Sequence, residues 1–240
     1  MFGGQGVKIG ELFGIKIYLN SSWFLIASVF VLSMQLYFAK AVPNQHAFSY
    51  WIFGILTAAL LFISLLAHEF SHCLMARPFG IVFRSITLLM LGAVAISHTP
   101  LSKTTAKAEF FISLAGPLSN FAMAGALLSA ADSLNLPKTS LVLESIALIA
   151  TMNIVLGLFN LLPCFPMDGG RVLRAVLWWR TENIQKATTI AFWAATITCV
   201  LLVSALVWKA SMWQALWIGT ILTFIIRAGY TECRALSESE

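Results

Sequence analysis

Six long apolar segments constrain this sequence more than any other feature, because each is about as long as a membrane is thick. They lie near residues 22–41, 51–75, 108–130, 141–162, 188–208 and 213–228. A chain inside lipid has to satisfy its own backbone hydrogen bonds, and a helix does so within one segment. Only 10% of the residues are charged, whereas 59% are hydrophobic. The sequence therefore predicts an all-α polytopic membrane protein with about six transmembrane helices.

Two regions outside these segments have strand character. In residues 7–19, β-branched residues alternate with others and Gly10 and Gly14 interrupt the pattern, so we expect a short N-terminal β element. The stretch 82–97 is apolar but too short for a comfortable span. We expect it to form a re-entrant strand or hairpin near the polar motif at residues 68–72 of the second apolar segment, with a buried loop as the alternative.

The basic residues indicate the orientation in the membrane. With six spans, 12 of the 15 Lys and Arg residues fall on one side, and Lys40, Lys138 and Lys209 fall on the other. Because basic residues near segment ends accumulate on the cytoplasmic side, we expect both termini there. The basic residues are spread over several loops, so we expect the lipid bilayer as a partner and no nucleic acid. The expected parts are N-terminal cytoplasmic strands at 1–21, a six-span membrane core at 22–228 and a short cytoplasmic tail at 229–240.

The second apolar segment contains the motif His68-Glu69-Phe70-Ser71-His72. On a helix, the H-E-x-x-H spacing places both histidines on one face, one turn apart, with the glutamate available as a general base for water. A carboxylate and two imidazoles inside a lipid-spanning helix are costly and mark a functional site. We therefore expect His68 and His72 to bind zinc, and Glu69 to be the catalytic base of a protease.

A second polar cluster, NLLPCFPMDGGR, begins at Asn160 and closes the fourth segment. Its prolines break the helix and its glycines permit a sharp turn, which leaves Asp168 near the membrane end of a segment. A catalytic zinc usually takes three protein ligands, and Asp168 completes that number with the two histidines. The alternative is that Asp168 caps a helix that starts near Gly170. The four cysteines occur singly and indicate no thiolate zinc site.

With these motifs the sequence resembles the site-2 protease family of intramembrane zinc metalloproteases. The resemblance rests on HEFSH at 68–72, GPLSN at 116–120 and NLLPCFPMDGG at 160–170, in that order. It extends from about residue 7 to about residue 230. The given sequence contains no inserted PDZ domain and no C-terminal pair of CBS domains, so it is similar to the compact branch of the family. From this compactness and the resemblance we expect the protein in the cytoplasmic membrane of a prokaryote.

The resemblance implies a function and a set of roles. His68, His72 and Asp168 match the family's ligands for one Zn²⁺ ion per chain, and Glu69 matches its catalytic base. The implied reaction is cleavage of a peptide bond in or near the transmembrane segment of another membrane protein. The implied partner is therefore a protein substrate with a transmembrane segment, whereas the sequence leaves the oligomeric state open.

Peptide hydrolysis also needs a hydrogen-bond donor for the oxyanion of the transition state. Asn120 and Asn160 are the candidates for this role or for positioning the substrate, and the sequence does not decide between them. The alternative for Asn120 is helix packing through the small residues Gly116 and Ser119.

A substrate helix is hydrogen-bonded to itself and has to unwind before it can be cleaved. An exposed strand edge in residues 84–97 would hold the extended peptide by strand addition. The residues expected in this substrate strand are Ile86, Gly92 and Ala93.

Three alternatives stay open at this point. A transporter or proton relay would use His68, Glu69 and Asp168 to conduct protons or to bind a passing ion. A catalytically silent binder of membrane segments would have no evident need for Glu69. A protease with a glutamate as third ligand would have to use one of the later glutamates, none of which lies in a comparable motif. These are Glu109, Glu144, Glu182, Glu232, Glu238 and Glu240.

Overall fold

The computed structural model describes residues 6–89, 92–97, 104–135, 137, 139–165 and 167–207. The chain divides into two compact units. The first consists of Met1–Lys103 with Leu118–Gly157, and the second of Thr104–Pro117 with Leu158–Glu240. The third and fourth helices described below each contribute to both units.

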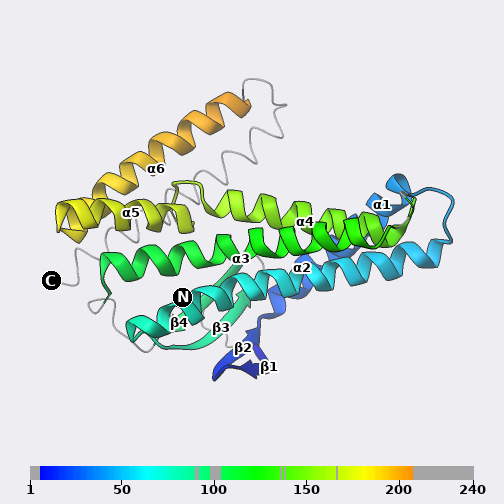
Figure 1. Cartoon of the computed structure of the whole chain (residues 1–240), viewed down its shortest axis with the longest axis horizontal. Helices are drawn as coiled ribbons and strands as arrows, with labels where there is room; N and C mark the ends of the chain where they lie inside the picture. Colours follow the sequence, from blue (N-terminus) through cyan, green and yellow to red (C-terminus); the bar gives the residue numbers. More distant parts are fainter. Residues whose placement is uncertain are drawn as a thin grey trace. The chain divides into compact units, whose positions relative to one another are not determined.

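Four helices of the described residues are long and apolar enough to cross a membrane. They are α1 (Ser21–Ala41), α2 (Ala47–Ala76, continued by the 3-10 turn η1 at Arg77–Phe79), α3 (Ala106–Ser133) and α4 (Leu141–Asn160), labelled in Figure 1. Each covers one of the first four expected segments, so the largely helical membrane fold is confirmed. A further helix, α6 (Ile184–Val207), covers the fifth expected segment up to residue 207. The sixth expected segment and the tail at 229–240 lie outside the described residues, so the count of six spans stays a prediction.

Both regions with strand character form hairpins. The first hairpin consists of β1 (Val7–Leu12) and β2 (Ile15–Leu19), which pair antiparallel. Phe13 and Gly14 connect them with φ angles of 52° and 77°, the left-handed backbone of a tight hairpin turn. The second hairpin consists of β3 (Phe83–Leu89) and β4 (Gly92–Ser97), so the expected hairpin at residues 82–97 is confirmed, whereas its re-entry into the membrane stays a prediction.

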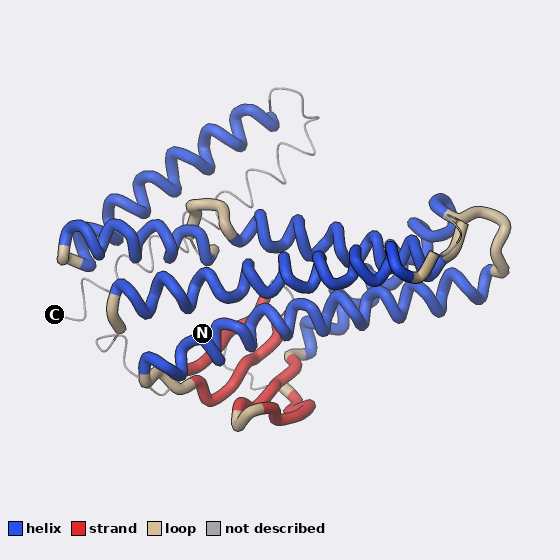
Figure 2. The backbone as a smooth tube through the Cα atoms, viewed as in Figure 1, coloured by secondary structure: helices blue, strands red, loops and turns tan. Residues whose placement is uncertain are grey.

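The two hairpins join into one sheet in the order β1-β2-β3-β4. The joining pair, β2 and β3, is parallel, with Lys16 opposite Ser85 and Leu19 opposite Leu88. Figure 2 shows the four strands together beside the C-terminal half of α2. The sequence predicted a short β element at residues 7–19 and a strand or hairpin at residues 82–97. It did not predict the pairing of β2 with β3, two strands that α1 and α2 separate in the sequence.

Apolar packing fixes the C-terminal half of α2 on the sheet. Alternate residues of β2 are buried, and Ile17 packs with Ile86 and Leu88 of β3 in one apolar cluster. Phe70 and Cys73 of α2 belong to the same cluster. Burying a large apolar side chain of this kind contributes about 1.5–3 kcal/mol. The helix turn that carries the H-E-x-x-H motif is therefore held by a packed core.

The second unit contains α5 (Asp168–Thr181) and α6. Its core consists of Cys164 and Phe165, from the turn before α5, packed with Ala191 and Ala195 of α6. Helix α5 has only 14 residues and is not among the candidate spans. Its first residue is Asp168.

Candidate metal centre

The two histidines of the motif lie one turn apart on α2, as their spacing predicts. Their Nε2 atoms are 3.1 Å apart, and their ring centroids are 4.8 Å apart in an edge-to-face arrangement. His68 is buried at 3% exposure, whereas His72 and Glu69 are half-buried. Because α2 continues to Ala76 without a break, the helix itself fixes the distance between the two imidazoles.

Asp168 is placed by a turn in which backbone packs directly on backbone. A Cβ atom on the next residue, Gly169, would lie 2.2 Å from the carbonyl oxygen of Leu161 and 2.3 Å from that of Leu162. Such distances are far below van der Waals contact, so only glycine fits at this position. The N-cap of α5 is Met167, which makes no side-chain capping bond, and Asp168 is the first helical residue. The alternative that Asp168 is the capping residue of this helix is therefore not what the structure shows.

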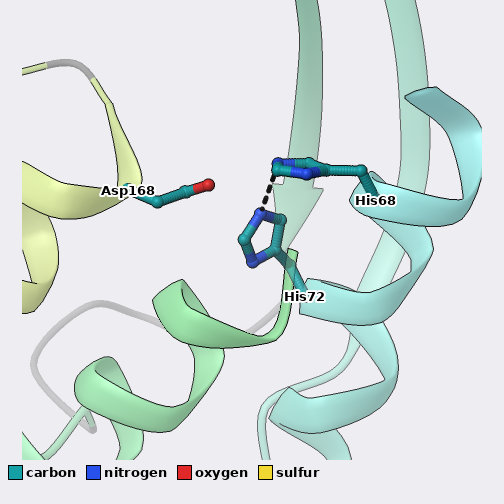
Figure 3. Close-up of side chains that lie close together, drawn as sticks. All are labelled: His68, His72 and Asp168. Carbon is teal, nitrogen blue, oxygen red and sulfur yellow. Dashed lines mark hydrogen bonds between the residues drawn. The ribbon is translucent and has the colours of Figure 1, made fainter. Parts of the chain in front are cut away.

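His68, His72 and Asp168 form a group that can hold a metal ion. Each offers one ligand atom, and these atoms all lie within 4.8 Å of one another. Figure 3 shows the carboxylate of Asp168 directed toward the two imidazole rings. Two imidazole nitrogens and a carboxylate oxygen are a donor set that zinc prefers. The separation of the two Nε2 atoms also fits, since ligands at tetrahedral angles and bond lengths of 2.0–2.1 Å are about 3.3 Å apart.

Behind His68 lies a chain of buried polar side chains within the first unit. The Nδ1 atom of His68 contacts Oδ1 of Asn120, on α3. The amide nitrogen of Asn120 donates to Oδ1 of Asn153, on α4, at 2.9 Å. The amide nitrogen of Asn153 lies 3.1 Å from Oγ of Ser64, on α2, and 2.9 Å from the carbonyl oxygen of Ile149.

These hydrogen bonds affect the choice between the two asparagines that the sequence offered as oxyanion donors. Both ends of the Asn120 amide are held, because its nitrogen donates one hydrogen to Asn153 and its Oδ1 atom contacts His68, which favours a structural role for Asn120 beside His68. Asn160 is half-buried at the last position of α4 and remains a candidate donor. Neither Asn153 nor Ser64 was expected at the site from the sequence. Their signals were an asparagine in the middle of an apolar helix, and a serine one turn before His68 on the same helix face.

The residues expected in the substrate strand occupy different positions in the sheet. Ile86 is fully buried on β3, whose two edges already pair with β2 and β4. Gly92 and Ala93 lie on β4, which is an edge strand among the described residues. A peptide added to this sheet beside the second hairpin would therefore pair with β4.

The second unit also contains a buried ion pair that was not predicted from the sequence. Nε of Arg174, on α5, donates to Oε1 of Glu109 at 2.8 Å, and a second guanidinium nitrogen donates to the same oxygen. The guanidinium also lies over the ring of Phe165, 5.4 Å from its centre. Since α5 begins with Asp168, this pair ties the helix that carries the candidate ligand to the first turns of α3.

Two overlapping stretches of the chain, residues 56–141 and 132–204, match peptidase family M50. Together they extend over residues 56–204, which is more than half of the 240 residues. The chain belongs to peptidase family M50. Both the H-E-x-x-H motif and Asp168 fall within the matched residues. The family and the apolar helices together make the chain an integral membrane protein.

Individual relatives of this M50 chain carry names that agree with the site. It is 37% identical over 194 residues to a Synechocystis protein with a provisional zinc metalloprotease name, covering 79% of this chain and 49% of the relative. It is 32% identical over 240 residues to Rip3 of Mycobacterium tuberculosis, also provisionally named a zinc metalloprotease, covering 98% of this chain and 61% of the relative. The chain thus spans about half to three fifths of the length of these curated relatives.

A solved structure agrees with the described fold. The site-2 protease from Methanocaldococcus jannaschii matches with a TM-score of 0.59 and 26% sequence identity. The match covers 95% of this chain and 94% of that chain. The resemblance to site-2 proteases that the three motifs indicated is therefore confirmed.

Proposed function

We propose that this chain is a zinc-dependent endopeptidase that cleaves a peptide bond in or near transmembrane segments of other membrane proteins. The observation that carries the proposal is the His68, His72 and Asp168 donor group, with two of its members on a helix that is apolar enough to span a membrane. The zinc metalloprotease names of the relatives and the likeness to a solved site-2 protease support it.

The roles of the residues follow from their chemistry. His68, His72 and Asp168 hold the metal. When bound, zinc supplies polarisation of the scissile carbonyl and lowers the pKa of water. Glu69 lies on the same turn of α2, accepts the proton of the attacking water and delivers it to the leaving amine. Asn160 donates a hydrogen bond to the developing oxyanion.

The substrate segment has to become extended before cleavage. In our proposal its backbone pairs with β4, so that Gly92 and Ala93 lie opposite the bound peptide. Crosslinkers placed at these two positions should then capture the substrate. Capture from α1 or α2 alone, with none from β4, would remove the support for strand addition.

The orientation in the membrane is part of the proposal. We propose that both termini lie in the cytoplasm, because basic residues near segment ends accumulate on that side, and that the membrane is the cytoplasmic membrane of a prokaryote. A cysteine introduced in the turn at Phe13 should therefore react with a membrane-impermeant thiol reagent only in inverted vesicles. Labelling of this cysteine in intact cells would contradict the proposed orientation and indicate the opposite one.

The activity is tested with purified protein in proteoliposomes that also contain a protein with one transmembrane helix. Mass spectrometry of the products should locate a cut in or near that helix. Glu69→Gln should lower the rate at least about 100-fold, since general acid–base catalysis contributes at least this much. The matched control is Glu11→Gln, which changes an exposed carboxylate that pairs with Lys8, three residues away.

Zinc content separates the protease from its alternatives. The wild type and Glu69→Gln should both retain about one zinc per chain, and Asp168→Ala should lose it or bind it more weakly. A wild type that holds no zinc, or an Asp168→Ala variant that holds it equally well, would overturn the ligand assignment. Zinc transport into vesicles without any cleavage would favour the transporter.

A further inference from the structure

The hydrogen bonds behind His68 have a donor-to-acceptor direction, which is fixed where Asn153 contacts the backbone of α4. The carbonyl oxygen of Ile149 carries no hydrogen, so its 2.9 Å contact with Asn153 requires the amide nitrogen of Asn153 as donor. The same nitrogen has a second hydrogen, which points to Oγ of Ser64 at 3.1 Å. Both hydrogens of this amide are thus used, and its Oδ1 atom is left as an acceptor.

The orientation of the Asn153 amide determines the orientation of the Asn120 amide. Only a donor can face Oδ1 of Asn153, so Asn120 presents its amide nitrogen there, at 2.9 Å. Asn120 consequently turns its Oδ1 atom toward Nδ1 of His68. An amide oxygen can only accept, and the hydrogen between these two atoms therefore belongs to His68.

A protonated Nδ1 leaves the lone pair of His68 on Nε2. This is the nitrogen that lies 3.1 Å from Nε2 of His72, in the candidate metal centre. The backbone of α4 thereby determines which ring nitrogen of His68 is available to a metal. A histidine ligand whose second nitrogen is held in this way is fixed in tautomer and in ring orientation.

Because the four side chains are buried, the loss of any hydrogen bond among them is costly. Exposure is 3% for His68, 1% for Asn120, 1% for Asn153 and 4% for Ser64, so no solvent replaces a missing partner. A buried polar group that loses its partner costs about 1–3 kcal/mol. All four side chains belong to the first unit, in which α2, α3 and α4 supply one or two members each.

We propose that Asn120 and Asn153, anchored by Ser64 and the carbonyl of Ile149, are positioning residues that prepare His68 to bind zinc through Nε2. The inference rests on the proposed zinc site and adds that its affinity depends on residues that touch neither metal nor substrate. It also gives Asn120 a role other than oxyanion stabilisation. The role of Asn153 is to set the orientation of Asn120.

The test measures zinc affinity by competition with a chelator in detergent, beginning with the wild type. Asn120→Leu and Asn153→Leu should each weaken binding about 10–100-fold, which is typical for the loss of a group that orients a metal ligand. Asn120→Asp retains an acceptor for Nδ1 of His68 and should recover most of the affinity. The matched control is Thr57→Val, which replaces a buried polar side chain by an apolar one on α2, the helix of His68. Thr57 does not belong to the hydrogen-bonded set behind His68, so this change should leave the zinc affinity unchanged.

A second measurement determines the tautomer of His68 in the wild type itself. The nitrogen NMR spectrum of wild type labelled at its four histidines should show His68 with a proton on Nδ1, assigned by the signal that His68→Ala removes. A proton on Nε2 in the metal-free protein, or zinc affinities of both leucine variants within twofold of wild type, would overturn the inference. A wild type without zinc affinity would instead overturn the proposed function. The NMR spectrum would still decide whether His68 donates its Nδ1 hydrogen to Asn120.

Discussion

The buried pair between Glu109 and Arg174 gives the sharpest prediction about stability. The Glu109→Gln substitution keeps the size of the side chain but removes its charge, which takes the carboxylate partner away from a guanidinium. The two side chains are only 8% and 7% exposed. Breaking a buried pair in this way costs about 3–5 kcal/mol, whereas an exposed pair is worth about 0–1 kcal/mol. At about 2–4 °C per kcal/mol for a chain of this size, Glu109→Gln should melt about 6–20 °C below wild type.

The assay is thermal unfolding in detergent, followed by tryptophan fluorescence. Lys107→Gln changes an exposed charge two residues away on the same helix and should melt within about 2 °C of wild type. The double variant Glu109→Leu with Arg174→Met removes both charges and should recover most of the loss, because apolar replacements of a buried pair are often neutral. If Glu109→Gln melts with wild type, or the double variant melts as low as Glu109→Gln, the buried-pair reasoning is refuted.

Three further predictions use other parts of the chain. Gly169→Ala should abolish zinc binding, because its Cβ would lie 2.2 Å from a carbonyl oxygen, whereas Gly125→Ala, with open space around its Cβ, should stabilise α3 by up to about 1 kcal/mol; equal zinc contents would contradict this. Removing zinc with a chelator should lower the melting temperature of wild type but not of Asp168→Ala, since a ligand stabilises only a protein that binds it; equal shifts would place the metal elsewhere. Gly14→Ala should destabilise the first hairpin by about 1 kcal/mol because φ is 77° there, measured as faster hydrogen exchange of β1; unchanged exchange would argue against the strained turn.

Much of the fold could be predicted because its signals are local. Apolar segments of sufficient length predicted α1 to α4, and the strand character of residues 7–19 and 82–97 predicted short strands in both regions. The parallel pairing of β2 with β3 could not be predicted in this way. The two strands are separated by α1 and α2, and periodicity within a strand carries no information about its distant partner.

The candidate site divides in the same manner. The spacing of His68 and His72 is a property of one helix, and the proline and glycine residues around Asp168 mark a turn wherever it lies in space. Asn153 has no such local signature, because a single asparagine in an apolar helix is equally consistent with helix packing. Its contacts with Asn120 and Ser64 join residues that are 33 and 89 positions away in the chain.

The contact at Gly169 also has a mechanical consequence. Side chains between two segments act as a compliant layer, since they change rotamer to absorb a small displacement. No such layer exists here, because the backbone of Gly169 lies directly against the carbonyl groups of Leu161 and Leu162. The end of α4 and the start of α5 therefore have to move as one rigid body. A substrate that pushes on this turn would displace Asn160 and Asp168 together and leave the spacing between them unchanged.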